Sequence, residues 1–102
     1  MTKQTKEMKQ DIELSIVNQT KILNHINKKV SYETTPQEFK DYKEEIEQVN
    51  NNMNKILDTF ILTQQQCDLY FDLLTLKQAT ETKVNTIYNE IYYGQLSNMY
   101  HV

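Results

Sequence analysis

The sequence is organised around residues 35–56, which read TPQEFKDYKEEIEQVNNNMNKI. Thr35 can accept hydrogen bonds from free amide groups at a helix start, and Pro36 suits the first helical position because it has no N–H to satisfy there. Glu38 stands three residues after Thr35, which is the spacing of a capping box. We therefore predict that a helix begins at Pro36.

A heptad repeat follows this start signal and keeps its phase from Phe39 to Ile91. Most of its a and d residues are apolar. The full set of a and d residues is Phe39, Tyr42, Ile46, Val49, Met53, Ile56, Phe60, Thr63, Cys67, Tyr70, Leu74, Lys77, Glu81, Val84, Tyr88 and Ile91. Separate helices joined by turns have no reason to share one heptad register. The repeat therefore predicts one long coiled-coil helix over residues 36–93.

Two polar stretches offer places where this helix could break. Thr63 and Gln66 also have capping-box spacing, so a new helix could start near residues 63–67, and a second break could fall at residues 79–83. The alternative architecture is a compact three-helix bundle. Gly94 follows the last apolar heptad positions, where a left-handed helix cap is expected, and residues 94–102 are predicted to form a tail.

A second apolar stripe lies before residue 35. Its members recur at spacings of three and four, with one polar slot filled by Gln19: Ile12, Ile16, Gln19, Leu23, Ile26 and Val30. This periodicity predicts a helix over about residues 5–29. Leu14, Val17 and Ile22 lie off the stripe and predict that a second neighbour touches this helix. The first helix then folds back on the second as a hairpin.

Composition supports an all-α fold in one domain over residues 1–102. The chain has one glycine and one proline, too few for the turns of a β-rich protein. Its hydrophobic fraction of 38% and charged fraction of 25% fit neither a disordered chain nor a membrane protein. No stretch approaches the ~20 apolar residues of a membrane span, and residues 1–10 do not lead into the apolar run of a signal peptide. The lone Cys67 suits a reducing compartment, so a cytoplasmic location is expected.

Residues that could carry catalysis or bind metal are few. His25 is placed on the outward side of the first helix, His101 in the tail, and Cys67 in the heptad seam. No Cys/His pair has metal-ligand spacing, no Glu stands three residues before either histidine, and no Gly-rich loop could hold a phosphate. The sequence therefore predicts no catalytic residue, no metal ligand and no cofactor. A net charge of −3 and the absence of arginine argue against nucleic acid as a partner.

The second half of the long heptad run has a wider apolar face than a two-helix contact needs, because several leucines join the a and d residues. Such a face calls for two or more neighbouring helices. Tyrosine adds to it, and tyrosine is common at interface hot spots. The predicted protein interface consists of Leu69, Tyr70, Leu73, Leu76, Tyr88, Ile91 and Tyr92.

These features predict a non-catalytic interaction subunit that self-assembles or docks to a helical partner subunit. The alternative is a small inhibitor, encoded by a phage or mobile element, that binds a host enzyme; the small size, the acidic charge and the AT-rich residue bias motivate it. The length and hairpin are also similar to those of the WXG class of secreted helical hairpins. The Trp-x-Gly turn of that class is absent, and residues 30–35 stand in its place.

Overall fold

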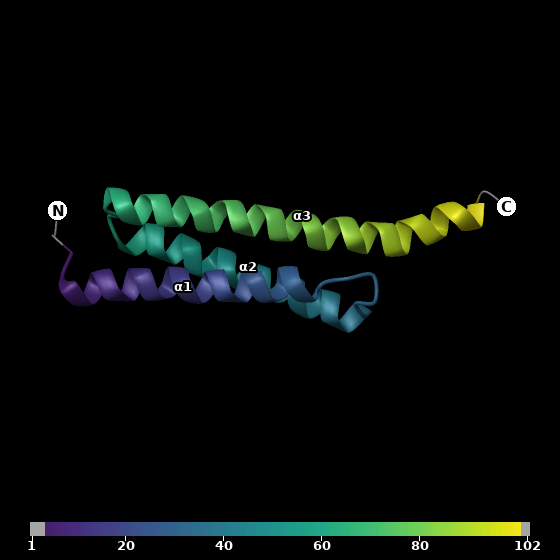
Figure 1. Cartoon of the computed structure of the whole chain (residues 1–102), viewed down its shortest axis with the longest axis horizontal. Helices are drawn as coiled ribbons and strands as arrows, with labels where there is room; N and C mark the ends of the chain where they lie inside the picture. Colours follow the sequence, from purple (N-terminus) through teal and green to yellow (C-terminus); the bar gives the residue numbers. More distant parts are fainter. Residues whose placement is uncertain (1–3, 101–102) are drawn as a thin grey trace.

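The protein is a three-helix bundle in a computed structural model that describes the backbone of residues 4–100 and the side chains of residues 4–94. The helices are α1 (Lys6–Lys29), α2 (Pro36–Thr59) and α3 (Gln64–Tyr100), and the described residues include no strand. Figure 1 shows α1 and α3 running in the same direction, with α2 running the opposite way. The bundle is elongated, measuring 65 × 18 × 18 Å, and α3 extends past the turn that joins α1 to α2. The all-α prediction is confirmed.

The second helix ends at Thr59, so the continuous helix predicted over residues 36–93 is wrong and the three-helix alternative describes the chain. Phe60 has an extended backbone, with φ −124° and ψ 150°. The next helix starts in its own capping box: the Thr63 hydroxyl accepts from the Gln66 N–H at 3.2 Å, and the Thr63 N–H donates to Gln66 Oε1 at 3.0 Å. These bonds satisfy amide groups that a continuous helix would have bonded internally. No break occurs at residues 79–83, which lie inside α3.

The first helix forms as its sequence predicts, and α2 begins at the predicted residue, Pro36. Thr5 caps α1 by accepting from the Met8 N–H at 3.1 Å, and Thr35 and Glu38 form the reciprocal capping box of α2 at 3.2 and 3.0 Å. All residues of the two apolar stripes over these helices are buried, including the polar one: Ile12, Ile16, Gln19, Leu23, Ile26, Val30, Phe39, Tyr42, Ile46, Val49, Met53 and Ile56. The core of the bundle lies along these two stripes.

The buried line of α3 differs from the predicted heptad seam, of which only Val84 is buried among the described residues of this helix. Gln66, Leu73, Thr80 and Ile87 recur every seven residues and are buried, whereas Cys67, one position along from Gln66, is exposed. This helix packs against both α1 and α2. Its most buried line therefore faces the space between two neighbours, and the predicted column is turned to one side.

The C-terminal part of α3 continues further than predicted. Gly94 lies inside the helix and does not have a positive φ, so the predicted left-handed cap at this residue is wrong. The backbone remains in the ordinary right-handed conformation and extends the helix to Tyr100. The last two residues of the predicted tail, 101–102, lie outside the described residues.

Candidate protein-interaction site

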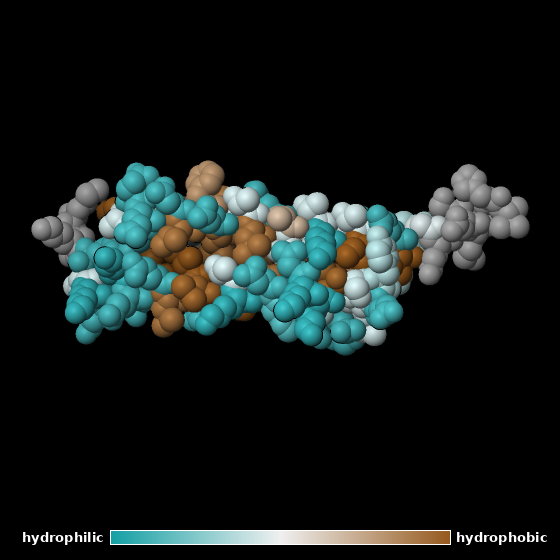
Figure 2. Space-filling view, in the orientation of Figure 1, coloured by the Kyte–Doolittle hydropathy of each residue, from teal (hydrophilic) through white to brown (hydrophobic). Residues whose placement is uncertain are grey.

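An open apolar groove of about 570 Å³ runs between α1 and α3. The buried side chains of Ile16 and Leu73 form its floor, and Val17, Leu69 and Leu76 line its sides. Val17 is 47% exposed and Leu69 is 38% exposed. Figure 2 shows apolar surface gathered on this face, over the space between the two helices. We call these five residues the apolar groove.

Helical spacing explains why these side chains share one surface. On α1, Glu13, Val17 and Lys21 stand four residues apart, so one apolar side chain lies between an acid and a base on the same face. On α3, Leu69 and Leu76 stand seven residues apart, or two helical turns. The groove therefore has an apolar floor, with Glu13 and Lys21 toward its ends on α1 and Asp72 between the two leucines of α3.

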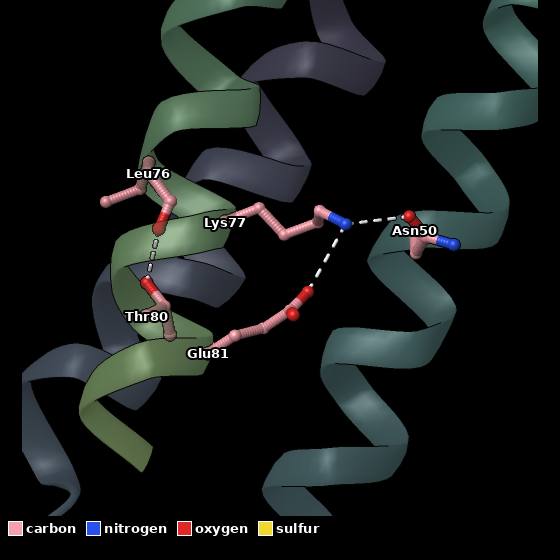
Figure 3. Close-up of polar contacts among 5 residues, drawn as sticks. All are labelled: Asn50, Leu76, Lys77, Thr80 and Glu81. Atoms are coloured by element: carbon pink, nitrogen blue, oxygen red, sulfur yellow. Dashed lines mark hydrogen bonds and ion pairs between the residues drawn. The ribbon is translucent and has the colours of Figure 1, made fainter. Parts of the chain in front are cut away.

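A second groove, of about 380 Å³, lies between α2 and α3, and most of the residues that line it are polar. We define the polar groove by its polar lining residues, Lys43, Glu47, Asn50, Lys77, Glu81 and Asn85. Figure 3 shows Lys77 reaching from α3 toward α2. Its ammonium donates to Asn50 Oδ1 of α2 at 2.8 Å and pairs with Glu81 Oε1 of α3 at 3.2 Å. The Lys77 side chain is only 13% exposed, and its charge is compensated within the chain.

Polar pairs cross the core and fix how the helices align. Asn27 of α1 donates to the Thr80 hydroxyl of α3 at 2.7 Å, and the Thr80 hydroxyl donates to the Leu76 carbonyl at 2.7 Å. Asn52 of α2 donates to Gln19 of α1 at 3.3 Å. Every buried side-chain nitrogen or oxygen among the described residues has a partner. Sliding one helix along another would leave these groups unpaired, so the pairs set the register.

A further polar pair joins the start of the chain to the start of α3. The side-chain amides of Gln4 and Gln66 bond reciprocally at 2.7 and 2.8 Å, and Gln4 also donates to the Ile61 carbonyl at 2.6 Å. Gln66 therefore serves both the capping box of α3 and a contact with the segment before α1. This end of the bundle is closed by hydrogen bonds.

The structure brings three of the seven predicted interface residues together at the apolar groove. Leu69 and Leu76 line its sides, and Leu73 lies on its floor with an exposed fraction of 2%. Tyr70 faces α2 instead, where its hydroxyl donates to the Met53 carbonyl at 3.3 Å. Burial raises the pKa of the Tyr70 hydroxyl above its ordinary value, and the charge of Asp58 adds to this rise.

The other three predicted residues, Tyr88, Ile91 and Tyr92, pack against the core near the far end of the bundle. The ring of Phe39 from α2 meets Tyr88 edge-on, with 5.3 Å between ring centroids, and Tyr92 at 6.3 Å. The ammonium of Lys43 lies 4.3 Å from the centre of the Tyr88 ring. These aromatic contacts are made within the chain.

The interface prediction missed the contribution of α1 to the groove, which is Ile16 and Val17. The signal was present, because Val17 lies off the apolar stripe of α1 and predicts a second neighbour for this helix. Ile22, also off the stripe, lines a smaller groove of about 330 Å³ between α1 and α2, together with the exposed His25. Cys67 is exposed on α3.

Within residues 4–100, no three His, Cys, Asp or Glu side chains gather as they would around a metal ion. None of the helices in that range is long and apolar enough to cross a membrane. No protein-family model matches the chain, and no curated protein or solved structure matches it significantly.

Proposed function

We propose that this chain is a non-catalytic protein-interaction module that accepts a helix of a protein partner in the apolar groove. The observation that carries the proposal is the exposure of Val17 and Leu69 on the two helices that border a buried apolar floor. Packing of an added helix against α1 and α3 would complete a four-helix bundle. Such contacts would be of the coiled-coil kind, with apolar side chains of the incoming helix set between those of α1 and α3.

Burial of these side chains supplies the driving force for binding. Full burial of a valine or leucine side chain stabilises an assembly by about 1.5–3 kcal/mol, and Val17 and Leu69 are each buried only in part by the chain itself. An amphipathic helix presents apolar residues at i, i+3, i+4 and i+7, which matches a groove walled by two helices. The exposed thiol of Cys67 fits a protein that works in a reducing compartment such as the cytoplasm.

The polar groove is less suited to a helical partner. Its buried cation, Lys77, already has a carboxylate and an amide oxygen as partners. A helix covering this groove would remove those groups from water, and it would have to replace the lost hydration with new hydrogen bonds. At the apolar groove the one charged side chain between Leu69 and Leu76 is Asp72, which is exposed, so this cost is smaller.

Site-specific photo-crosslinking in the native cells tests the proposal. A photoreactive phenylalanine analogue placed at Leu69 should give a covalent adduct with a protein after illumination. The matched control is the same analogue at Lys55, an exposed residue of α2 away from the groove. Mass spectrometry of the adduct then identifies the crosslinked peptide, which we expect to be helical. An analogue at Leu69 that gives no more adduct than the one at Lys55 would contradict the proposal.

A further inference from the structure

We infer that the helix bound in the apolar groove is α1 of a second copy of this chain. In this arrangement α1 of each copy lies between α1 and α3 of the other. The inference rests on the proposed function, because it names the occupant of the same groove. It is carried by the shape and the charges of α1.

The outer surface of α1 forms an apolar ridge beside the groove. Leu14 and Val17 stand three residues apart on this surface and are 60% and 47% exposed. Val17 also lines the groove. One helix therefore provides both the ridge and a wall of the groove. A pair of copies related by a two-fold axis can place each ridge in the groove of the other, as a self-complementary interface requires.

Charges on α1 select the direction in which two such helices would pack. Glu13 and Lys21 both line the groove and stand four residues before and after Val17, about 6 Å along the helix axis in each direction. With the two-fold axis near Val17 and the helices antiparallel, Glu13 of one copy lies opposite Lys21 of the other, and the pair occurs twice. Parallel helices would set like charges together. Asp72, the third charged lining residue, belongs to α3 and leaves this symmetry of α1 unchanged.

Lys21 is exposed and Glu13 is half-buried. Pairs between such residues select the partner and its direction more than they add affinity. The apolar contacts of Leu14, Val17 and Leu69 supply the driving force. A helix from an unrelated protein would need its own ridge and its own matching charges, whereas a second copy of this chain already carries both.

Reciprocal charge exchange in the full-length chain tests the inference, with sedimentation equilibrium as the measurement. The wild-type protein should reach twice the 12.2 kDa mass of one chain as its concentration rises. Lys21→Glu and Glu13→Lys should each weaken association about tenfold, because each turns two attractive pairs into repulsive ones. The double variant carrying both changes should restore association to near the wild-type level, since the opposite charges meet again.

Lys55→Glu is the matched control: it makes the same charge change on an exposed surface of α2 and should leave association unchanged. Circular dichroism should show equal helix content in all variants, because both exchanged residues lie outside the buried stripe of α1. A chain that stays monomeric over the accessible concentration range would overturn the inference. A double variant that associates no better than the single variants would overturn it too. If residues 13 and 21 of the two copies face each other, opposite charges meet again in the double variant and association must recover.

The two proposals fail in different ways. A monomeric purified chain together with a Leu69 adduct to another protein would refute the second copy and keep the interaction site. A monomeric chain with no adduct specific to Leu69 would refute both.

Discussion

The apolar groove and the polar groove border two sides of the same helix, α3. They differ in whether the side chains that line them have partners within the chain. On the side of α2, Lys77 lies between Asn50 and Glu81 at 2.8 and 3.2 Å. On the side of α1, Val17 and Leu69 keep 47% and 38% of their surface exposed. Open volume alone therefore does not mark a binding surface. An apolar surface is a candidate binding site where its side chains are not buried by other parts of the same chain.

Substitutions at Leu73 and Leu69 should separate the contribution of the apolar groove to folding from its contribution to association. Leu73→Ala should lower the free energy of unfolding by about 2–5 kcal/mol, because Leu73 is 2% exposed and its loss leaves a cavity under the groove. Leu69→Ala should cost about 1 kcal/mol or less in a monomer while weakening association. Urea unfolding at low protein concentration measures both effects. Equal losses in the two variants would show that Leu69 belongs to the core.

Asn50 and Lys77 test whether the polar side is satisfied within the chain. Asn50→Ala should cost about 1–3 kcal/mol of unfolding free energy, because it removes an acceptor from an ammonium that is 13% exposed. Lys77→Met should cost less, since it removes the charge and keeps the apolar stem. Both can be measured by urea unfolding. The contrast between the grooves is wrong if either variant weakens self-association about tenfold, as Lys21→Glu in the apolar groove should.

Gly94 lies on α3 beyond both grooves and reports on the helix that they share. Gly94→Ala should raise the free energy of unfolding by up to about 1 kcal/mol, because alanine loses less backbone entropy in a helix. An added Cβ would meet nothing within 4 Å. Thermal unfolding measures the gain. If the variant were less stable, Gly94 would be the left-handed cap that the sequence predicts.

Glu38 adds a pH dependence to α2, the helix that borders the polar groove but not the apolar groove. Hydrogen bonds from the Thr35 backbone N–H and hydroxyl group hold the pKa of the Glu38 carboxyl below its ordinary value of 4.5. A lowered pKa stabilises the fold above the unfolded value, and the contribution disappears as the pH falls through the folded one.

Glu38→Gln keeps a capping side chain but loses the titration. The stability difference between this variant and the wild type should therefore shrink as the pH falls from neutral to below the ordinary carboxyl range. Thermal unfolding over a pH series measures it. A difference that grows on acidification would mean that the carboxylate does not stabilise the start of α2. The neutral capping box of Thr63 and Gln66 on α3 has no such dependence.

The sequence predicts α1 and the start and buried face of α2 well, because each helix buries one narrow stripe. The stripes follow the helical period closely, and even Gln19 is buried in the expected slot. Both capping boxes, Thr35 with Glu38 and Thr63 with Gln66, are also visible in the sequence, although the second was only an alternative start. Local hydrogen bonding and periodicity together decide these elements.

The break after Thr59 could not be decided in the same way. Phe60 and Leu62 are apolar, and the heptad phase continues through the turn, so periodicity does not separate one helix from two. The buried line of α3 was misjudged for a related reason. It depends on where two neighbours stand, and Leu73 is central only because α1 and α2 lie on either side.

The candidate site was predicted in part. Leu69, Leu73 and Leu76 were identified because they widen the apolar face of α3, and they line the apolar groove. Tyr88 and Tyr92 have the composition of an interface, but their rings pack against Phe39. Composition cannot distinguish an aromatic ring that packs in the core from one that packs against a partner, because both rings are buried.

Nuclear magnetic resonance of the full chain over a concentration series tests the central claim most directly. Backbone amide signals of Val17, Leu69 and Leu76 should shift as the concentration rises, while those of Asn50 and Asn85 in the polar groove stay constant. That pattern would place self-association at the apolar groove. Shifts centred on the polar groove, or no shifts at any concentration, would contradict it.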